Sequence, residues 1–173
     1  RAENPYTPAA YCWPSSMPQW AQDELKGELQ RLIDLLGLKT ALYNIESRLC
    51  TDGKTYIMEM SPRGGGNRLS EVLHMATGVN LIRGIVMASV GLAPDCVCDK
   101  PYDGLWAEII LHSDENGRFR ELWIDPDCEN FIVERDLWVS PGDEVERFSG
   151  ANKAVGTLVV RFPDRETLNV RMA

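Results

Sequence analysis

The chain has 173 residues, of which 44% are hydrophobic and 25% are charged, and its formal net charge is −8 at pH 7. This length suffices for one ordinary domain or two small subdomains, and the composition is that of a soluble globular protein. The acidic excess excludes nucleic acid as a general partner, because binding a phosphate backbone requires clustered Lys and Arg.

The first half of the chain is predicted to form a helix, a hairpin and two further helices. Residues 1–19 are rich in Pro, Tyr and Ser, which indicates an extended or looped start. Leucine and isoleucine recur at helical spacing over residues 20–36, and Gly37 follows as a C-terminal cap. After this helix we expect a β-hairpin and two short helices, over residues 42–63, 69–76 and 81–90.

The second half of the chain is predicted to form a small, mostly antiparallel β unit. Turn signals such as Asn116-Gly117 separate its hydrophobic segments, and Trp106, Trp123 and Trp138 are interpreted as core residues. A helix is expected to begin near Asp164. The predicted strands cover residues 105–111, 119–124, 131–133, 144–148 and 154–160.

These elements place the chain in the α+β class, with an antiparallel sheet, flanking helices and a small β subdomain. The composition changes after Pro94, which predicts two parts, residues 1–93 and 94–173. Because the chain starts at Arg1 and ends in what looks like a helix just beginning, we expect it to be a piece of a longer protein.

The cysteines indicate free thiols in a reducing cytosol, because their number is odd and their spacing is not that of a disulfide scaffold. Zinc held by Cys96, Cys98, Cys128 and a histidine is an alternative that the spacing disfavours. The longest apolar stretch, residues 81–92, is interrupted by polar residues and glycine, and no secretory signal opens the chain. We therefore expect a cytoplasmic protein without a membrane span.

The hairpin brings two glutamates together. Asp52-Gly53 is a strong signal for a tight turn, because such turns need residues that tolerate positive φ. With this pair at the tip, Thr51 is expected opposite Lys54, and counting back along the strands places Glu46 opposite Glu59.

Alternation along the strands predicts which side chains share a face of the hairpin. Asn44, Glu46, Glu59 and Ser61 are expected on one face, and Arg63 continues it. Two carboxylates, neutral oxygens and phosphate oxygens form a ligand set that Mg²⁺ prefers, whereas the alternative interpretation is ordinary surface charge on an edge hairpin. An apolar set is expected on the opposite face: Ile45, Leu49, Tyr56, Met58 and Met60.

A glycine-rich segment, Gly64 to Gly66, follows the hairpin and precedes a helix. Backbone amides at such a place can bind an anion, although the segment lacks the Gly-Lys-Ser/Thr pattern of a P-loop. The alternative is a flexible connection without a ligand. The candidate substrate contacts are Gly65, Gly66, Asn67 and Arg68.

Three segments together resemble the C-terminal core of the ATP-grasp superfamily. They are Tyr43-Asn44-Ile45-Glu46, the run from Asp52 to Arg63, and Ala76-Thr77-Gly78-Val79-Asn80-Leu81. The family hallmark is Glu-x-Asn-Pro-Arg at the end of a strand, with an earlier acidic or amide residue on the partner strand. Within the superfamily, residues 22–91 resemble carboxylate–amine ligases and the large chain of carbamoyl-phosphate synthetase.

The resemblance implies a site that holds ATP together with Mg²⁺ or Mn²⁺. It implies that Glu46 and Glu59 bind the metal shared with the triphosphate, with Ser61 as a further metal ligand and Asn44 in support. It also implies that Arg63 is catalytic and stabilises the γ-phosphate or an acyl phosphate. Ser61 departs from the family pattern, in which Asn is usual, and a serine hydroxyl is the poorer metal ligand.

The resemblance further implies that the parent protein is a ligase. Such an enzyme activates a carboxylate or bicarbonate with ATP as an acyl phosphate, which an amine then attacks. The family grips ATP with a preceding lid subdomain, so we expect the rest of the parent chain to supply the lid and this chain alone to be inactive. Exposed β edges favour a homodimer. A non-catalytic regulatory or oligomerising module and an unrelated α+β binding domain are the alternatives.

Overall fold

The computed structural model describes residue 4, residues 6–95 and residues 100–172. The chain forms two compact units, and each is described by itself. The hairpin unit comprises residues 15–101, and the sheet unit comprises residues 1–14 and 102–173. This division differs from the predicted one near residue 94, because a strand close to the start of the chain pairs with a strand of the second half.

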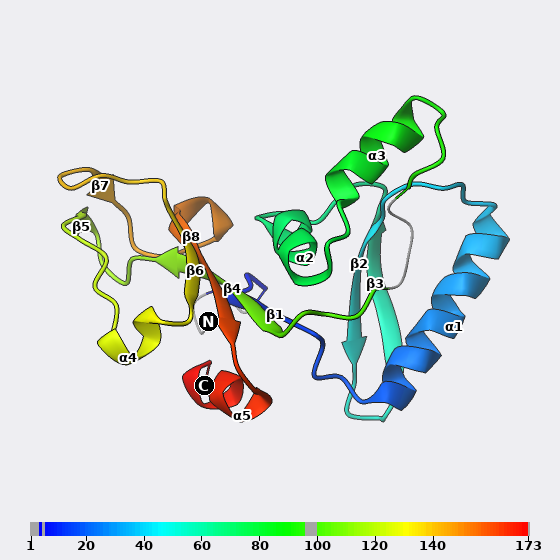
Figure 1. Cartoon of the computed structure of the whole chain (residues 1–173), viewed down its shortest axis with the longest axis horizontal. Coiled ribbons are helices and arrows are strands. Elements are labelled where there is room, and N and C mark those ends of the chain that lie inside the picture. Colours follow the sequence, from blue (N-terminus) through cyan, green and yellow to red (C-terminus); the bar gives the residue numbers. More distant parts are fainter. Residues whose placement is uncertain (1–3, 5, 96–99, 173) are drawn as a thin grey trace. The chain divides into compact units, whose positions relative to one another are not determined.

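The hairpin unit contains the elements expected of it (Figure 1). Two of its three helices are followed by a glycine in the left-handed conformation, at Gly37 with φ 60° and Gly78 with φ 71°, which satisfies the last helical carbonyl groups. Its elements are α1 (Gln19–Leu36), β2 (Asn44–Leu49), β3 (Thr55–Ser61), α2 (Leu69–Thr77) and α3 (Leu81–Ser89).

Helix α1 lies beside β3 and contacts it (Figure 1). The backbone N–H and the hydroxyl of Thr55 both donate to Glu24 Oε2 of α1, at 3.1 and 2.8 Å. Ile57 of β3 lies beside Leu32 and Leu35 of α1 in the lining of a shared groove. The face that carries Thr55 and Ile57 is therefore the covered face.

The sheet unit is built on one four-stranded antiparallel sheet in the order β1-β4-β8-β6. Strand β1 begins at Ala10, opposite Ile109 of β4, so the start of the chain forms an edge of the sheet instead of a loop. Further elements are a two-stranded sheet and three short helical segments. The bounds are β1 (Ala10–Trp13), β4 (Leu105–His112), β5 (Gly117–Arg118), α4 (Pro126–Glu129), β6 (Ile132–Leu137), β7 (Glu144–Val145), η1 (Ala151–Lys153), β8 (Ala154–Phe162) and α5 (Arg165–Arg171).

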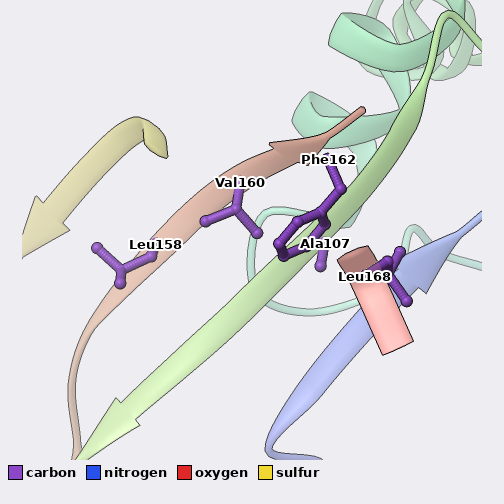
Figure 2. Close-up of a cluster of buried hydrophobic side chains, with 5 residues drawn as sticks. All are labelled: Ala107, Leu158, Val160, Phe162 and Leu168. Carbon is purple, nitrogen blue, oxygen red and sulfur yellow. The ribbon is translucent and has the colours of Figure 1, made fainter. Parts of the chain in front are cut away.

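The hydrophobic core of the sheet unit lies between the sheet and α5 (Figure 2). Side chains from one face of β4 and β8 meet Leu168 of α5, and Phe131 packs its ring 5.4 Å from that of Phe162. Burial of this apolar surface is the main stabilising contribution to the unit. The buried cluster consists of Ala107, Leu158, Val160, Phe162 and Leu168.

The prediction of a strand over residues 119–124 was wrong. Ladder pairing in this region is limited to Gly117 and Arg118, which pair with β7, and the chain then continues irregularly to α4. Leu122 and Ile124 still pack against the core. These two hydrophobic residues are therefore partly buried although their segment pairs with no strand in the described part of the chain. Helix α4 was not predicted, although Asp125 caps it by accepting from the backbone N–H of Asp127 at 2.9 Å.

The interpretation of three tryptophans as core residues was correct for one of them. Trp106 is buried, whereas the side chains of Trp123 and Trp138 are 72% and 50% exposed. The described cysteines, Cys12, Cys50 and Cys128, are free thiols as expected. The proposed zinc ligands Cys96 and Cys98 lie outside the described residues.

No single helix in the described part of the chain is both long and apolar enough to cross a membrane. Only α2 and α3 taken together have that length and composition, and a bend of 113° separates them.

Candidate metal site

The two strands of the hairpin bring the predicted glutamates into register. Glu46 is directly opposite Glu59, and Asn44 is directly opposite Ser61, as the sequence predicted. Side chains directly opposite on an antiparallel pair lie on the same face, with Cβ atoms about 5 Å apart. The predicted acidic pair is therefore present in the structure.

The turn that produces this register is not the predicted one. Cys50, not Thr51, pairs with Lys54, through a bond from Cys50 N to Lys54 O of 2.9 Å, and the loop contains three residues. Gly53 takes the left-handed conformation there, with φ 77°. A β-bulge at Met58 then adds one residue to β3 between Ile57 and Glu59, which restores the predicted pairing.

The bulge changes the face on which two side chains of β3 lie. Tyr56 pairs with Arg48, so it shares the face of Glu46, and it is 43% exposed. Met58 is the extra residue of the bulge and is 59% exposed. Their predicted place on the apolar face was wrong, because simple alternation does not allow for an inserted residue. The face of the acidic pair therefore carries three cross-strand pairs: Asn44–Ser61, Glu46–Glu59 and Arg48–Tyr56.

Each carboxylate of the pair is held by a neighbour two residues away on its own strand. Arg48 Nη2 donates to Glu46 Oε1 at 3.0 Å, and the Ser61 hydroxyl donates to Glu59 Oε1 at 2.7 Å. Both glutamates lie on the exposed side of the hairpin. Ser61 thus orients the carboxylate of Glu59 through Oε1.

The first glycines after the hairpin pack closely against it. A Cβ atom on Gly65 would lie 3.0 Å from Asn44 Oδ1 and 2.3 Å from Leu69 Cδ1, so this position has no room for a side chain without movement. A Cβ atom on Gly66 would meet nothing within 4 Å. The loop therefore packs closely beside Asn44 at Gly65, whereas open space lies beside Gly66.

The basic residues of the loop differ in what surrounds them. Arg63 is exposed, and its Nη1 donates to the carbonyl of Gly64 at 2.8 Å, so its guanidinium is accessible from solvent. The side chain of Arg68 is only 18% exposed, and its Nε donates to Glu71 of α2 at 2.6 Å. Asn67 adopts a left-handed conformation with φ 54°, which lets the chain turn into α2. Substrate contact by these residues stays a prediction.

The tip of the hairpin is fixed by a side-chain hydrogen bond. The Tyr56 hydroxyl donates to Asp52 Oδ2 at 2.8 Å. This bond lowers the pKa of the Asp52 carboxyl below its ordinary value and raises the pKa of the Tyr56 phenol above its ordinary value. The tip therefore holds its geometry between the pH ranges in which these two groups titrate.

The donor set fits a cation that takes part of its coordination shell from a ligand. Among the described residues, no group of three or more His, Cys, Asp or Glu side chains is arranged to hold a metal by itself. Two opposed carboxylates and a nearby amide and hydroxyl suit Mg²⁺, which usually keeps waters or phosphate oxygens in its shell. Binding of Mg²⁺ or Mn²⁺ at Glu46, Glu59 and Ser61 stays a prediction.

Arg48 is the site residue that sequence reasoning missed. Its position two residues after Glu46 on the same strand places both on one face, and that spacing was visible in the sequence. Only the ion pair in the structure shows that it neutralises one carboxylate of the pair.

Solved structures of enzymes show the same fold. Phosphoribosylglycinamide synthetase from Anaerococcus prevotii matches over 96% of this chain, with a TM-score of 0.77 and 20% sequence identity. L-amino acid ligase from Bacillus licheniformis matches over 96%, with a TM-score of 0.77 and 16% identity. The biotin carboxylase domain of Hydrogenobacter thermophilus 2-oxoglutarate carboxylase, in complex with MgADP and bicarbonate, matches over 95%, with a TM-score of 0.68 and 19% identity.

These likenesses establish the fold alone, because the sequence identities are low. They confirm the predicted fold class, which is α+β with an antiparallel sheet and flanking helices, as in the C-terminal part of the ATP-grasp fold. This chain spans 43%, 42% and 37% of the lengths of the three solved chains. No protein-family model matches the sequence, and no curated protein matches it.

Proposed function

We propose that this chain is the metal-holding, C-terminal part of an ATP- and Mg²⁺-dependent ligase. The whole protein would activate a carboxylate or bicarbonate as an acyl phosphate, which an amine then attacks to form a C–N bond, as in carbamoyl-phosphate synthetase. The observation that carries the proposal is the pairing of Glu46 with Glu59 on the exposed face of the hairpin, in a chain that has the ATP-grasp fold.

Three features support this function. The ATP-grasp neighbours include a synthetase, a ligase and a carboxylase domain, and the last was solved with MgADP and bicarbonate. Two opposed carboxylates on one exposed face repel each other, and a divalent cation bound between them would turn this repulsion into attraction. Arg63, two residues after the end of β3, presents an accessible guanidinium, which can donate two parallel hydrogen bonds to phosphate oxygens.

Each residue has a task in the proposed reaction. Bound Mg²⁺ supplies neutralisation of phosphate charge. Glu46 and Glu59 provide the carboxylate oxygens that hold it, and Ser61 orients Glu59 through its hydroxyl. Arg63 would donate to phosphate oxygens and stabilise the charge that develops on them. Gly65 allows the loop to approach Asn44 closely, because a Cβ atom there would lie 3.0 Å from Asn44 Oδ1.

Replacement of one carboxylate tests the proposal. In the full-length protein, Glu59→Gln keeps the size and removes the charge, so ATP-dependent ADP release should fall at least about 100-fold, the usual cost of losing an electrostatic stabiliser. Glu28→Gln changes an exposed glutamate of α1 and serves as the matched control. Activity and metal–nucleotide affinity that are unchanged in Glu59→Gln would exclude the carboxylate pair as the metal-holding site on which the proposal rests.

A non-catalytic module that keeps the fold is the second candidate. Ser61 favours it, because a hydroxyl stands where the family usually has the stronger amide ligand. Ser61→Asn separates the two candidates: an active ligase should keep or gain metal affinity and turnover, whereas a regulatory or oligomerising module should show no turnover before or after the change.

A further inference from the structure

Arg48 places a positive charge inside the acidic face of the hairpin. Its guanidinium is paired with Glu46 at 3.0 Å, and the side chains of Arg48 and Glu46 are 57% and 53% exposed. Register places Arg48 opposite Tyr56, one cross-strand pair away from Glu46 and Glu59 on the same face. The two carboxylates are therefore not equivalent, since Glu46 has a cationic partner and Glu59 a neutral hydroxyl partner.

We propose that Arg48 is a positioning residue that competes with a free divalent cation for Glu46, so that the site favours a cation already bound to phosphate. This inference rests on the proposed function, because it takes the carboxylate pair as the metal-holding site. It goes further by assigning to Arg48 the selection of metal–phosphate over metal alone.

The charges explain the selection. A bare divalent cation between the carboxylates must displace Arg48 from Glu46 and then remain within roughly 6–7 Å of it, the length of two strand residues. Repulsion at that distance in a largely solvated setting weakens cation binding by about tenfold, or ~1.4 kcal/mol. A metal–phosphate ligand brings its own negative charge, to which the displaced guanidinium can donate.

The side chain of Arg48 lies at an exposed position on the hairpin. It projects from the same exposed face as the acidic pair, and its cross-strand neighbour Tyr56 is anchored by its bond to Asp52. Because the Arg48–Glu46 contact joins two exposed side chains, Arg48 can leave Glu46 without a change in the strands. Release of Arg48 therefore requires only side-chain rotation, which costs little at an exposed position.

Binding of Mn²⁺ to the 173-residue chain tests the inference, with free Mn²⁺ measured by electron paramagnetic resonance. Without phosphate, Arg48→Gln should bind Mn²⁺ about tenfold more tightly than the unchanged chain, whereas Arg48→Lys keeps the charge and should stay within about threefold. Arg31→Gln removes the same charge from an exposed ion pair on α1 and is the matched control, which should leave the affinity unchanged. With added tripolyphosphate, the advantage of Arg48→Gln should disappear.

The outcomes separate the inference from the function on which it rests. Equal Mn²⁺ affinity in Arg48→Gln and the unchanged chain, or an equal gain in Arg31→Gln, would overturn the role of Arg48. Glu59→Gln examines the function: if this variant binds Mn²⁺ as the unchanged chain does, the carboxylate pair is not the metal site and both ideas fail. Loss of binding in Glu59→Gln together with no effect of Arg48→Gln would leave the function standing and refute the inference.

Discussion

The four-stranded sheet and the β2–β3 hairpin are both antiparallel, yet their side chains meet opposite environments. On β4, the consecutive residues Trp106 and Ala107 are 6% and 0% exposed, so this strand is covered on both faces. On the hairpin, α1 covers the face of Thr55 and Ile57, whereas the side chain of Glu46 on the other face is 53% exposed.

This difference shows that buried apolar side chains stabilise the sheet unit, whereas the hairpin unit carries its paired charges on an exposed face. In the described part of the hairpin unit, the fully buried hydrophobic side chains are small: Ala21, Val72 and Ala76. The sheet unit buries larger ones, including Phe162 and Leu168. An opposed pair of carboxylates would be very costly in such a core, and it is tolerated on a strand face that water reaches.

The largest expected effect comes from the core of the sheet unit. Phe162→Ala removes a ring that is 4% exposed and packs on Phe131, and it should lower the free energy of unfolding by about 3–5 kcal/mol. Leu35→Ala in α1, where the side chain is 81% exposed, should change it by less than about 0.5 kcal/mol. Urea unfolding followed by far-UV circular dichroism measures both. A similar cost for the two variants would contradict the contrast between the units.

A smaller effect on stability is expected at Gly65, which packs beside Asn44. Gly65→Ala forces a Cβ atom against Leu69 and Asn44, and such overpacking should cost about 1–3 kcal/mol. Gly66→Ala is the matched control, because its Cβ atom meets nothing within 4 Å and its effect should be neutral or slightly stabilising. Thermal unfolding of the two variants gives the comparison. Equal melting temperatures would mean that the loop does not pack on Asn44 in solution.

The smallest effects are expected at two helix caps, one in each unit. Asn80 caps α3 by accepting from Arg83 N at 2.8 Å, and Asn80→Ala should cost about 1 kcal/mol at any pH, because an amide does not titrate. Asp164 caps α5 by accepting from Thr167 N at 2.7 Å, and that bond lowers the pKa of its carboxyl.

The pH dependence distinguishes the two caps. A carboxyl whose pKa is lower in the folded state stabilises the protein above its unfolded pKa of about 3.9, and this contribution is lost as the pH falls through the folded pKa. Asp164→Ala should therefore differ from the unchanged chain at pH 7 and approach it in acid, while the Asn80→Ala difference persists. Urea unfolding at pH 7 and at successively lower pH checks this. A difference for Asp164→Ala that is independent of pH would show that its charge has no role in the cap.

Local signals in the sequence were sufficient for the helices of the hairpin unit. Helix α1 ends before Gly37, as predicted, and α2 ends at Thr77, one residue beyond its predicted end, because the capping conformation is a local property. Strand β1 could not be predicted in the same way. Its pairing with β4 joins Ala10 to Ile109, and such distant pairing leaves no periodic pattern near residue 10.

The acidic pair was predicted correctly through an incomplete description of the hairpin. The sequence suggested a two-residue turn at Asp52-Gly53, whereas the loop has three residues and Met58 bulges from β3. These two one-residue offsets cancel at Glu59 but not at Tyr56, which is why only the latter was placed on the wrong face. The prediction assumed that side chains alternate between the two faces without interruption. The actual register depends on backbone hydrogen bonds in the loop and at the bulge, which the residue types do not specify.

The extra residue in β3 also bears on how this protein tolerates changes of length. In a regular hairpin, adding or losing one residue at the loop moves every side chain of a strand to the other surface. Here the inserted Met58 separates the loop from the acidic pair, and loss of Met58 itself would leave Glu46 facing Glu59 in an uninterrupted ladder. Deletion of Met58 should therefore leave the acidic pair in place.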